Sequence, residues 1–223
     1  MKDLLISVAV GDIAGMPYEF GNRTKNYNDV RLLTAKSTYT DDTVCTFACA
    51  ESLLNHTDMA TTLWSRCRME KGRGYGGRFR QWLNHPHVTP AYNSFGNGSA
   101  MRVAPVGWAF QTEQEVMQWA ETSAACTHNH PEGIKGAQAT ALAILWARQG
   151  VSAADIEKRI TQLFAYDLTM SVEELQQRYS WRGIDGQGNG GICQDSVPQA
   201  IICALKADDF EDAIRNAVSI GGD

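Results

Sequence analysis

The chain has 223 residues, 43% hydrophobic and 20% charged, which is typical of a globular protein and allows one large domain or two small ones. The net charge is −5 and no basic arm or stripe occurs, so nucleic acid is disfavoured as a main partner. No apolar run approaches the ~20 residues of a membrane span, and Asp12 interrupts the short apolar N-terminus, which no cleavage signal follows. These observations predict a cytoplasmic protein with no membrane partner.

The six cysteines form no CxxC pair, and most lie in apolar runs of helical character. They are Cys45, Cys49, Cys67, Cys126, Cys193 and Cys203. We expect buried free thiols in a reducing compartment. Cys45 and Cys49 share a helix face, but a zinc site would need two more ligands from elsewhere in the chain.

The stretch 11–19 has the pattern Gly-Asp-x-x-Gly-x-Pro-x-Glu. Gly11, Gly15 and Pro17 predict the end of a helix followed by a turn, and segment 11–28 does not have helical periodicity. Asp12 and Glu19 are carboxylates in an otherwise apolar run. Such groups are costly to bury unless they are paired, hydrogen-bonded or bound to a metal.

Thr40-Asp41-Asp42 directly precedes an apolar-periodic segment and predicts a helix start. One carboxylate there would cap free backbone N–H groups and favour the positive end of the helix dipole. Two carboxylates and a hydroxyl offer more acceptor oxygens than a cap needs, and hard cations such as Mg²⁺ take ligands of this kind. The motif is therefore either a doubled cap or part of a metal site.

Helical periodicity dominates the rest of the chain, and strand-like alternation is nearly absent. The predicted helices are 42–55, 59–70, 113–127, 132–149, 153–165, 196–206 and 209–219. Thr112 with Glu115, and Ser171 with Glu174, have capping-box spacing; Pro131 and Pro198 suit a first helical turn. The short apolar cluster around Val30 is either a strand or a loop. We predict an all-α, single-domain compact helical bundle spanning residues 1–223.

Two loop motifs carry further polar groups. Ser94-Phe95-Gly96-Asn97-Gly98-Ser99 precedes a helix-like run and is either an ordinary Asn-Gly turn or a cradle for a phosphate, with Phe95 available to stack on a base. His85 and His87 lie in a proline-bounded turn that we expect to be exposed. His128 and His130 lie at a helix start, where they either cap the helix or bind a phosphate or ribose.

Two glycine-rich segments remain ambiguous. Segment 183–191 is either a flexible connection or a loop near a ligand. Gly221-Gly222-Asp223 is either a frayed end or the approach to another oxygen ligand.

The motifs, in their order along the chain, resemble those of the ADP-ribosylglycohydrolase family, which includes the dinitrogenase reductase-activating glycohydrolases. They are Gly-Asp-x-x-Gly-x-Pro-x-Glu, Thr-Asp-Asp-Thr, Gly-Asn-Gly-x-x-Met-Arg, Thr-His and Gly-Gly-Asp. Each motif is weak alone, but five in the right order from Val8 to Asp223 are a strong signal. The resemblance implies an all-α fold, two Mg²⁺ (or Mn²⁺) ions in a central cleft, and cleavage of the glycosidic bond between ADP-ribose and a modified protein or small molecule.

The resemblance also implies roles for particular residues. Metal ligands would be Thr40, Asp41, Asp42 and Asp223. The catalytic residues would be Glu19, either as general acid or base or as a residue that bridges the metals, and Asp41. Ser94, Phe95, Gly96, Asn97, Gly98 and Ser99 would form the loop that holds the pyrophosphate and distal ribose, and His128 would contact the ligand.

One departure from the family pattern affects these expectations. In the family the Gly-Gly-Asp motif continues as Ser-Asp-Thr and is followed by further helical sequence, whereas this chain stops at Asp223. We therefore expect impaired metal binding, low or absent activity, and an uncovered apolar face that favours a homodimer. The alternative is a non-catalytic ADP-ribose-binding or interaction protein on the same scaffold. A generic metal phosphohydrolase is disfavoured because the sequence lacks its His-Asp pair.

Overall fold

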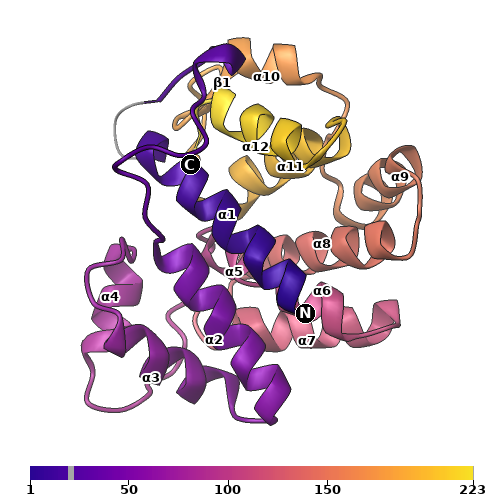
Figure 1. Cartoon of the computed structure of the whole chain (residues 1–223). Helices are drawn as coiled ribbons and strands as arrows, with labels where there is room; N and C mark the ends of the chain where they lie inside the picture. The colour runs from indigo at the N-terminus through magenta and orange to yellow at the C-terminus, as the bar shows by residue number, and fades with distance from the viewer. Residues whose placement is uncertain (20–22, 223) are drawn as a thin grey trace.

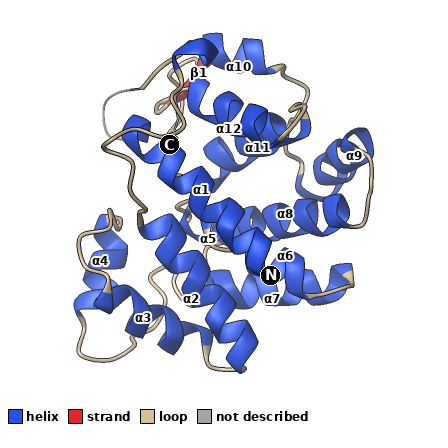
Figure 2. Ribbon diagram, in the orientation of Figure 1, coloured by secondary structure: helices blue, strands red, loops and turns tan. Residues whose placement is uncertain are grey.

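The structure is a computed structural model that describes residues 1–19 and 23–222, and its regular elements are almost all helical (Figures 1 and 2). The helices are α1 Lys2–Glu19, η1 Tyr27–Asp29, α2 Asp41–Asn55, α3 Met59–Met69, α4 Gly77–Asn84, α5 Gly98–Met101, α6 Ala104–Ala109, α7 Glu113–Ala125, α8 Pro131–Arg148, α9 Ala153–Phe164, α10 Val172–Arg178, α11 Cys193–Leu205 and α12 Phe210–Ser219. In the described part of the chain, the sheet consists of β1 (Tyr179–Ser180) antiparallel to β2 (Gly183–Ile184). The predicted all-α fold is confirmed.

The alanine-rich helix α8 lies at the centre of the core and packs against α5, α6, α7 and α11. Small side chains let its neighbours approach closely. A Cβ on Gly136 would lie 2.5 Å from the Cys193 sulfur in α11, and one on Gly107 in α6 would lie 2.4 Å from the Ala141 carbonyl oxygen. Glycine at these two positions therefore allows α11 and α6 to pack onto α8.

Most predicted helix boundaries agree with the structure to within two residues. Both predicted capping boxes are present, with reciprocal hydrogen bonds between Thr112 and Glu115 and between Ser171 and Glu174. His85 and His87 are exposed, as expected. All six cysteines are free, and five of them are buried. Within residues 1–19 and 23–222, no helix combines the length and the apolar character needed to span a bilayer.

The prediction of a loop beginning at Gly11 is wrong, because α1 continues through Gly11, Gly15 and Pro17 to Glu19. This helix contacts α2, α6 and α12. Those tertiary contacts outweigh the ~1 kcal/mol by which each internal glycine disfavours a helix. Pro17 lacks the N–H that would donate to the Ile13 carbonyl oxygen, but it falls in the last turn, so the disruption is confined to the C-terminal end of α1.

Helix α11 begins earlier than predicted, at Cys193, so Pro198 lies inside the helix and not in its first turn. The backbone N–H of Cys193 donates to the Phe95 carbonyl oxygen at 3.0 Å, which fixes the helix start against a distant loop. The region around Val30 is a 3₁₀ turn and bend and not a strand. The sequence did not predict the short helices α4, α5, α6 and α10, because each has too few turns to establish a helical period.

Candidate active site

The start of α2 has the predicted capping arrangement. The Thr40 hydroxyl accepts a hydrogen bond from the Asp42 backbone N–H at 3.3 Å, and Asp41 and Asp42 occupy the first helical turn. Both carboxylates also line a cavity of about 380 Å³. Asp41 and Asp42 therefore lie at the helix start and also reach the cavity.

Asp12, on α1, ties that helix to the start of α2. Its carboxylate accepts hydrogen bonds from the Thr40 backbone N–H at 2.8 Å and the Thr40 hydroxyl at 2.7 Å. It also accepts from the backbone N–H and the hydroxyl of Thr43. The sequence indicated that this carboxylate needed partners, and its four hydrogen bonds supply them.

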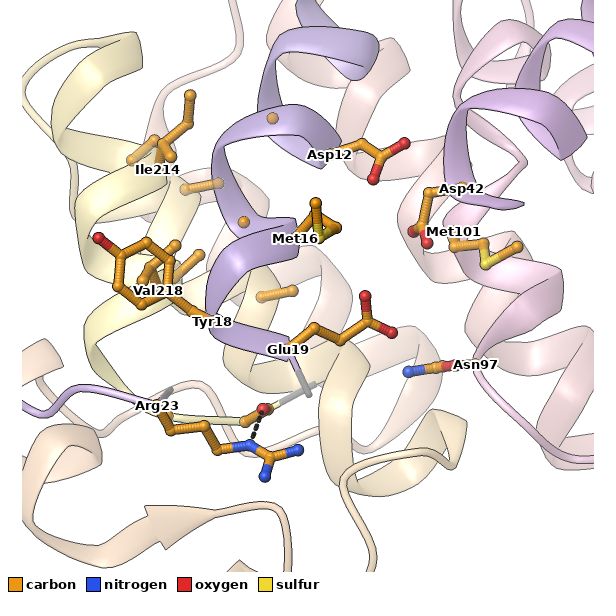
Figure 3. A pocket seen from close by; sticks show the side chains of 18 residues that line it. Asp12, Met16, Tyr18, Glu19, Arg23, Asp42, Asn97, Met101, Ile214 and Val218 are labelled. Carbon is orange, nitrogen blue, oxygen red and sulfur yellow. Dashed lines mark hydrogen bonds between the residues drawn. The ribbon is translucent and has the colours of Figure 1, made fainter. Parts of the chain in front are cut away.

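Glu19, at the end of α1, lies where two cavities meet. The first is the 380 Å³ cavity beside Asp41, and the second, of about 400 Å³, lies between α1 and α12. Glu19, Asp42, Asn97 and Met101 line both. In Figure 3, the Glu19, Asp42 and Asn97 side chains point toward one another, although they come from three different elements. The predicted catalytic and metal-ligating carboxylates thus share one hollow with the Asn97 loop.

The opposite part of the 380 Å³ cavity is lined by segments that are rich in glycine. Gly74, Gly76 and Gly77 lead into α4, and Arg78 follows in its first turn. Arg78 donates to the Tyr92 carbonyl oxygen and lies over the Tyr92 ring, 5.0 Å from its centroid. Sequence reasoning missed this region, although four glycines between residues 72 and 77 were a signal for close backbone approach.

Only part of the predicted binding loop 94–99 lies in the cavity wall, since Ser99 is buried in the core and Phe95 is 38% exposed. Ser94, Gly96, Asn97 and Gly98 line the 380 Å³ cavity. Among the residues that the structure describes, Phe95 and Ser99 are not part of either cavity wall. The Phe95 ring packs against His130 with 5.0 Å between centroids, and the buried Ser99 hydroxyl donates to the Gly133 carbonyl oxygen at 2.7 Å.

The glycine-rich segment 183–191 lies beside this loop and is therefore near the candidate site. The Asn97 backbone N–H donates to the Gly191 carbonyl oxygen at 3.0 Å, and Gly96 forms an isolated antiparallel bridge with Ile192. The Gly190 N–H donates to the Trp181 carbonyl oxygen, and the Trp181 side chain lines the cavity while remaining 42% exposed. Sequence reasoning did not select Trp181, because nothing local to it indicated a cleft.

His128 lies in the cavity wall and is only 6% exposed. Burial, and then the positive charges of Arg102 and Arg78, hold its pKa well below the usual value near 6.5. The imidazole is therefore neutral at physiological pH. Its neighbour His130 has the predicted capping role and accepts a hydrogen bond from the Glu132 backbone N–H at 3.1 Å.

The oxygen atoms of Thr40, Asp41 and Asp42 have the chemistry that Mg²⁺ prefers. However, within residues 1–19 and 23–222, no three His, Cys, Asp or Glu side chains gather closely enough to hold a metal ion. Asp223, the predicted ligand from the second half, lies outside the described residues. The described donor set thus fits part of a magnesium site, and the two-ion site stays a prediction.

The end of α12 is held near the cleft by two cations from the segment after α1. Arg23 Nε donates to the Gly222 carbonyl oxygen at 3.0 Å (Figure 3). Lys25 donates to the carbonyl oxygens of Ile220 and Tyr179. Since Gly221 and Gly222 also line the cavity between α1 and α12, the Gly-Gly segment lies on the side of the molecule that carries Glu19.

These features define a class of protein: an all-α bundle with a polar cleft between its α1–α2 pair and a set of glycine-rich loops. The chain matches the family model for ADP-ribosylglycohydrolase over residues 1–223, and it belongs to this family.

Relatives agree with that assignment, and a solved structure shares the fold. ADP-ribosylhydrolase ARH3 of Mus musculus is 30% identical over 241 residues, covering 83% of this chain and 65% of the mouse protein. An uncharacterised protein of Archaeoglobus fulgidus is 26% identical over 260 residues, covering 100% of this chain and 82% of that protein. A solved ADP-ribosylglycohydrolase-related protein complex has the same fold, with a TM-score of 0.73 and 23% identity over 99% of this chain and 80% of that chain. The chain thus spans about 65% of the length of the mouse relative.

Proposed function

We propose that this chain is an ADP-ribosylglycohydrolase that removes ADP-ribose from a modified target by hydrolysing its glycosidic bond. The observation that supports this best is the mixed character of one cavity. Carboxylates enter it from α1 and α2, whereas Arg78, Arg102 and His128 enter it from α4, from the end of α5 and from the loop before α8. ADP-ribose has matching parts, since it carries an anionic diphosphate at its centre and a ribose at its reactive end.

In this proposal, the diphosphate lies near Arg78 and the loop 94–98, and the reactive ribose lies near Glu19 and Asp41. A guanidinium binds a phosphate through charge-assisted hydrogen bonds, which are stronger than neutral ones. Binding the remote part of ADP-ribose in this way positions the anomeric carbon beside the carboxylates.

Glu19 would act as the general acid or base. Cleavage of a glycosidic bond passes through an oxocarbenium-like transition state, which is cationic and is stabilised by nearby carboxylates. Glu19 would remove a proton from the attacking water, while the negative charge of Asp41 and Asp42 stabilises the developing positive charge.

Thr40, Asp41 and Asp42, with Asp223, would hold divalent cations, Mg²⁺ or Mn²⁺. When bound, such ions would orient the ribose hydroxyls beside the carboxylates. Their hard oxygen donors support this choice over zinc or copper.

The test is an assay of ADP-ribose release from substrates that carry ADP-ribose on arginine or on serine, with Mg²⁺ and with a chelator. We expect release that depends on Mg²⁺. The free ADP-ribose is measured by chromatography. No release from any of these substrates at any metal concentration would contradict the proposed activity.

The second candidate is a protein that binds ADP-ribose without cleaving its bond to a target. It is favoured by one observation: among residues 1–19 and 23–222, no group of three His, Cys, Asp or Glu side chains could hold a metal ion. Binding of ADP-ribose by calorimetry, together with no release in the assay above, would support this candidate over the enzyme.

A further inference from the structure

Arg102 is a cation buried directly behind the candidate site. It is 1% exposed, and it contributes to the wall of the 380 Å³ cavity. Its guanidinium donates to the carbonyl oxygens of Gly98 at 3.2 Å and Ser123 at 2.6 Å. It also donates to the Thr127 hydroxyl at 2.9 Å. Because a guanidinium has donors and no acceptor, the Thr127 oxygen must be the acceptor in that bond.

The fully buried Thr127 hydroxyl has one proton to donate in turn. Among the described residues it pairs with Nδ1 of His128 at 2.8 Å and also lies beside the Cys126 sulfur, which is a weak acceptor. If Nδ1 carried the proton instead, the hydroxyl would accept two N–H groups and could give its own buried proton only to that sulfur, which is less favourable. The geometry therefore makes Nδ1 the acceptor and Thr127 the donor.

A neutral imidazole whose Nδ1 accepts a hydrogen bond carries its proton on Nε2. Nε2 faces the binding loop, since a Cβ on Gly98 would lie 3.2 Å from it and one on Gly96 would lie 3.5 Å from it. Both glycines line the 380 Å³ cavity, as His128 does. No hydrogen bond occupies Nε2 in the part of the chain that the structure describes, so its N–H is available to a ligand.

We propose that Arg102 and Thr127 are positioning residues that fix His128 as the Nε2–H tautomer, so that His128 donates a hydrogen bond to an acceptor oxygen of the bound ligand. His128 would then recognise a phosphate, carbonyl or ribose oxygen and would have no lone pair on Nε2 with which to accept a proton. The identity of the ligand rests on the proposed function, whereas the position of the proton does not.

The position of the proton is tested on the protein without ligand. Long-range ¹H–¹⁵N spectra of protein labelled in its histidines distinguish protonated from unprotonated ring nitrogens, and His128→Gln identifies the His128 signals. We expect an unprotonated Nδ1 and a protonated Nε2 at neutral pH. Proton on Nδ1, or a charged imidazolium, would overturn the proposal.

Two variants of Thr127 distinguish the effect of its hydroxyl from the effect of its side-chain shape. Thr127→Val keeps the branched shape and removes the hydroxyl, and we expect His128 to lose its single tautomer. Thr127→Ser keeps the hydroxyl, and we expect the wild-type spectrum. An unchanged His128 spectrum in Thr127→Val would overturn the proposal, and the amide spectrum of each variant shows whether it is folded.

Calorimetry with ADP-ribose tests the link to the ligand. The ligand contact needs the Nε2–H tautomer, so we expect Thr127→Val, but not Thr127→Ser, to weaken binding. The loss is about twofold if the two tautomers become equally populated, and about fivefold, the value of one neutral hydrogen bond, if the proton moves to Nδ1. Equal affinity in Thr127→Val and wild type would overturn the ligand contact. If wild type shows the expected tautomer and does not bind ADP-ribose, the proposed function fails and the assignment of the proton stands.

Discussion

The two sides of the candidate site are built in different ways. The α1–α2 side presents carboxylates from the ends of two long helices, which Asp12 joins through hydrogen bonds to Thr40 and Thr43. The other side is assembled from three separate segments, around residues 74–78, 94–98 and 181–191. Backbone hydrogen bonds between loops, such as that from Asn97 N–H to the Gly191 carbonyl oxygen, hold it together.

The difference is also one of charge. The helical side is acidic, with Glu19, Asp41 and Asp42, and the loop side carries Arg78 together with the buried guanidinium of Arg102. A ligand that satisfies both sides must have an anionic part and a part that tolerates or needs carboxylates.

The largest effect is expected on the acidic side, from Glu19→Gln. Removing a general acid or base typically lowers turnover by about 10²- to 10⁴-fold. We expect ADP-ribose affinity, measured by calorimetry, to change little, because the rest of the cavity is intact. An unchanged turnover in the release assay would remove Glu19 from the mechanism.

Asp41→Asn tests whether the acidic side holds a metal ion. We expect Mn²⁺ affinity, measured by electron paramagnetic resonance, to fall by at least about 10- to 100-fold. That is the loss typical when a residue that only supports a metal ligand is replaced. Asp58→Asn is the matched control, because Asp58 is also a carboxylate at a helix start, that of α3, and does not line either cavity among the described residues. Equal Mn²⁺ affinity in both variants would contradict a metal site at α2.

On the loop side, Trp181→Ala and Phe95→Ala distinguish two aromatic residues. Trp181 lines the cavity, whereas the Phe95 ring packs against His130. A stacked aromatic contact contributes about 0.5–1.5 kcal/mol, so we expect Trp181→Ala to weaken ADP-ribose binding by about 3- to 10-fold and Phe95→Ala to have a smaller effect. The opposite order, measured by calorimetry, would restore the sequence-based role of Phe95 in stacking.

The smallest effect concerns stability. Burial lowers the pKa of His128 in the folded protein, so below about pH 6.5 the unfolded chain binds more protons than the folded one. This contribution to stability is complete above about pH 6.5 and is lost as the pH falls, by up to about 1.4 kcal/mol per pH unit. His128→Gln should therefore flatten the pH dependence of the free energy of unfolding, measured with urea. His85→Gln, at an exposed position, should leave it unchanged. Parallel profiles for wild type and His128→Gln would contradict this expectation.

The same contrast explains how much of the molecule the sequence predicted. Periodicity and capping residues located the long helices, and Thr40-Asp41-Asp42 marked the start of α2, because these signals act over a few neighbouring residues. The continuation of α1 through Gly11 and Pro17 was not predicted, since contacts with α2, α6 and α12 stabilise it. Trp181 and Arg78 could not be placed because their positions depend on how distant loops pack.

The hydrogen bonds of Asp12 also imply that the two long helices at the cleft move as one unit. Asp12 and Glu19 are seven residues apart, two helical turns along the same face of α1. A ligand that restrains the first turn of α2 would thereby slow amide hydrogen exchange along α1, including turns that do not reach the cavity. Slower exchange along the whole of α1 would then indicate that a ligand is bound at the acidic side of the cleft.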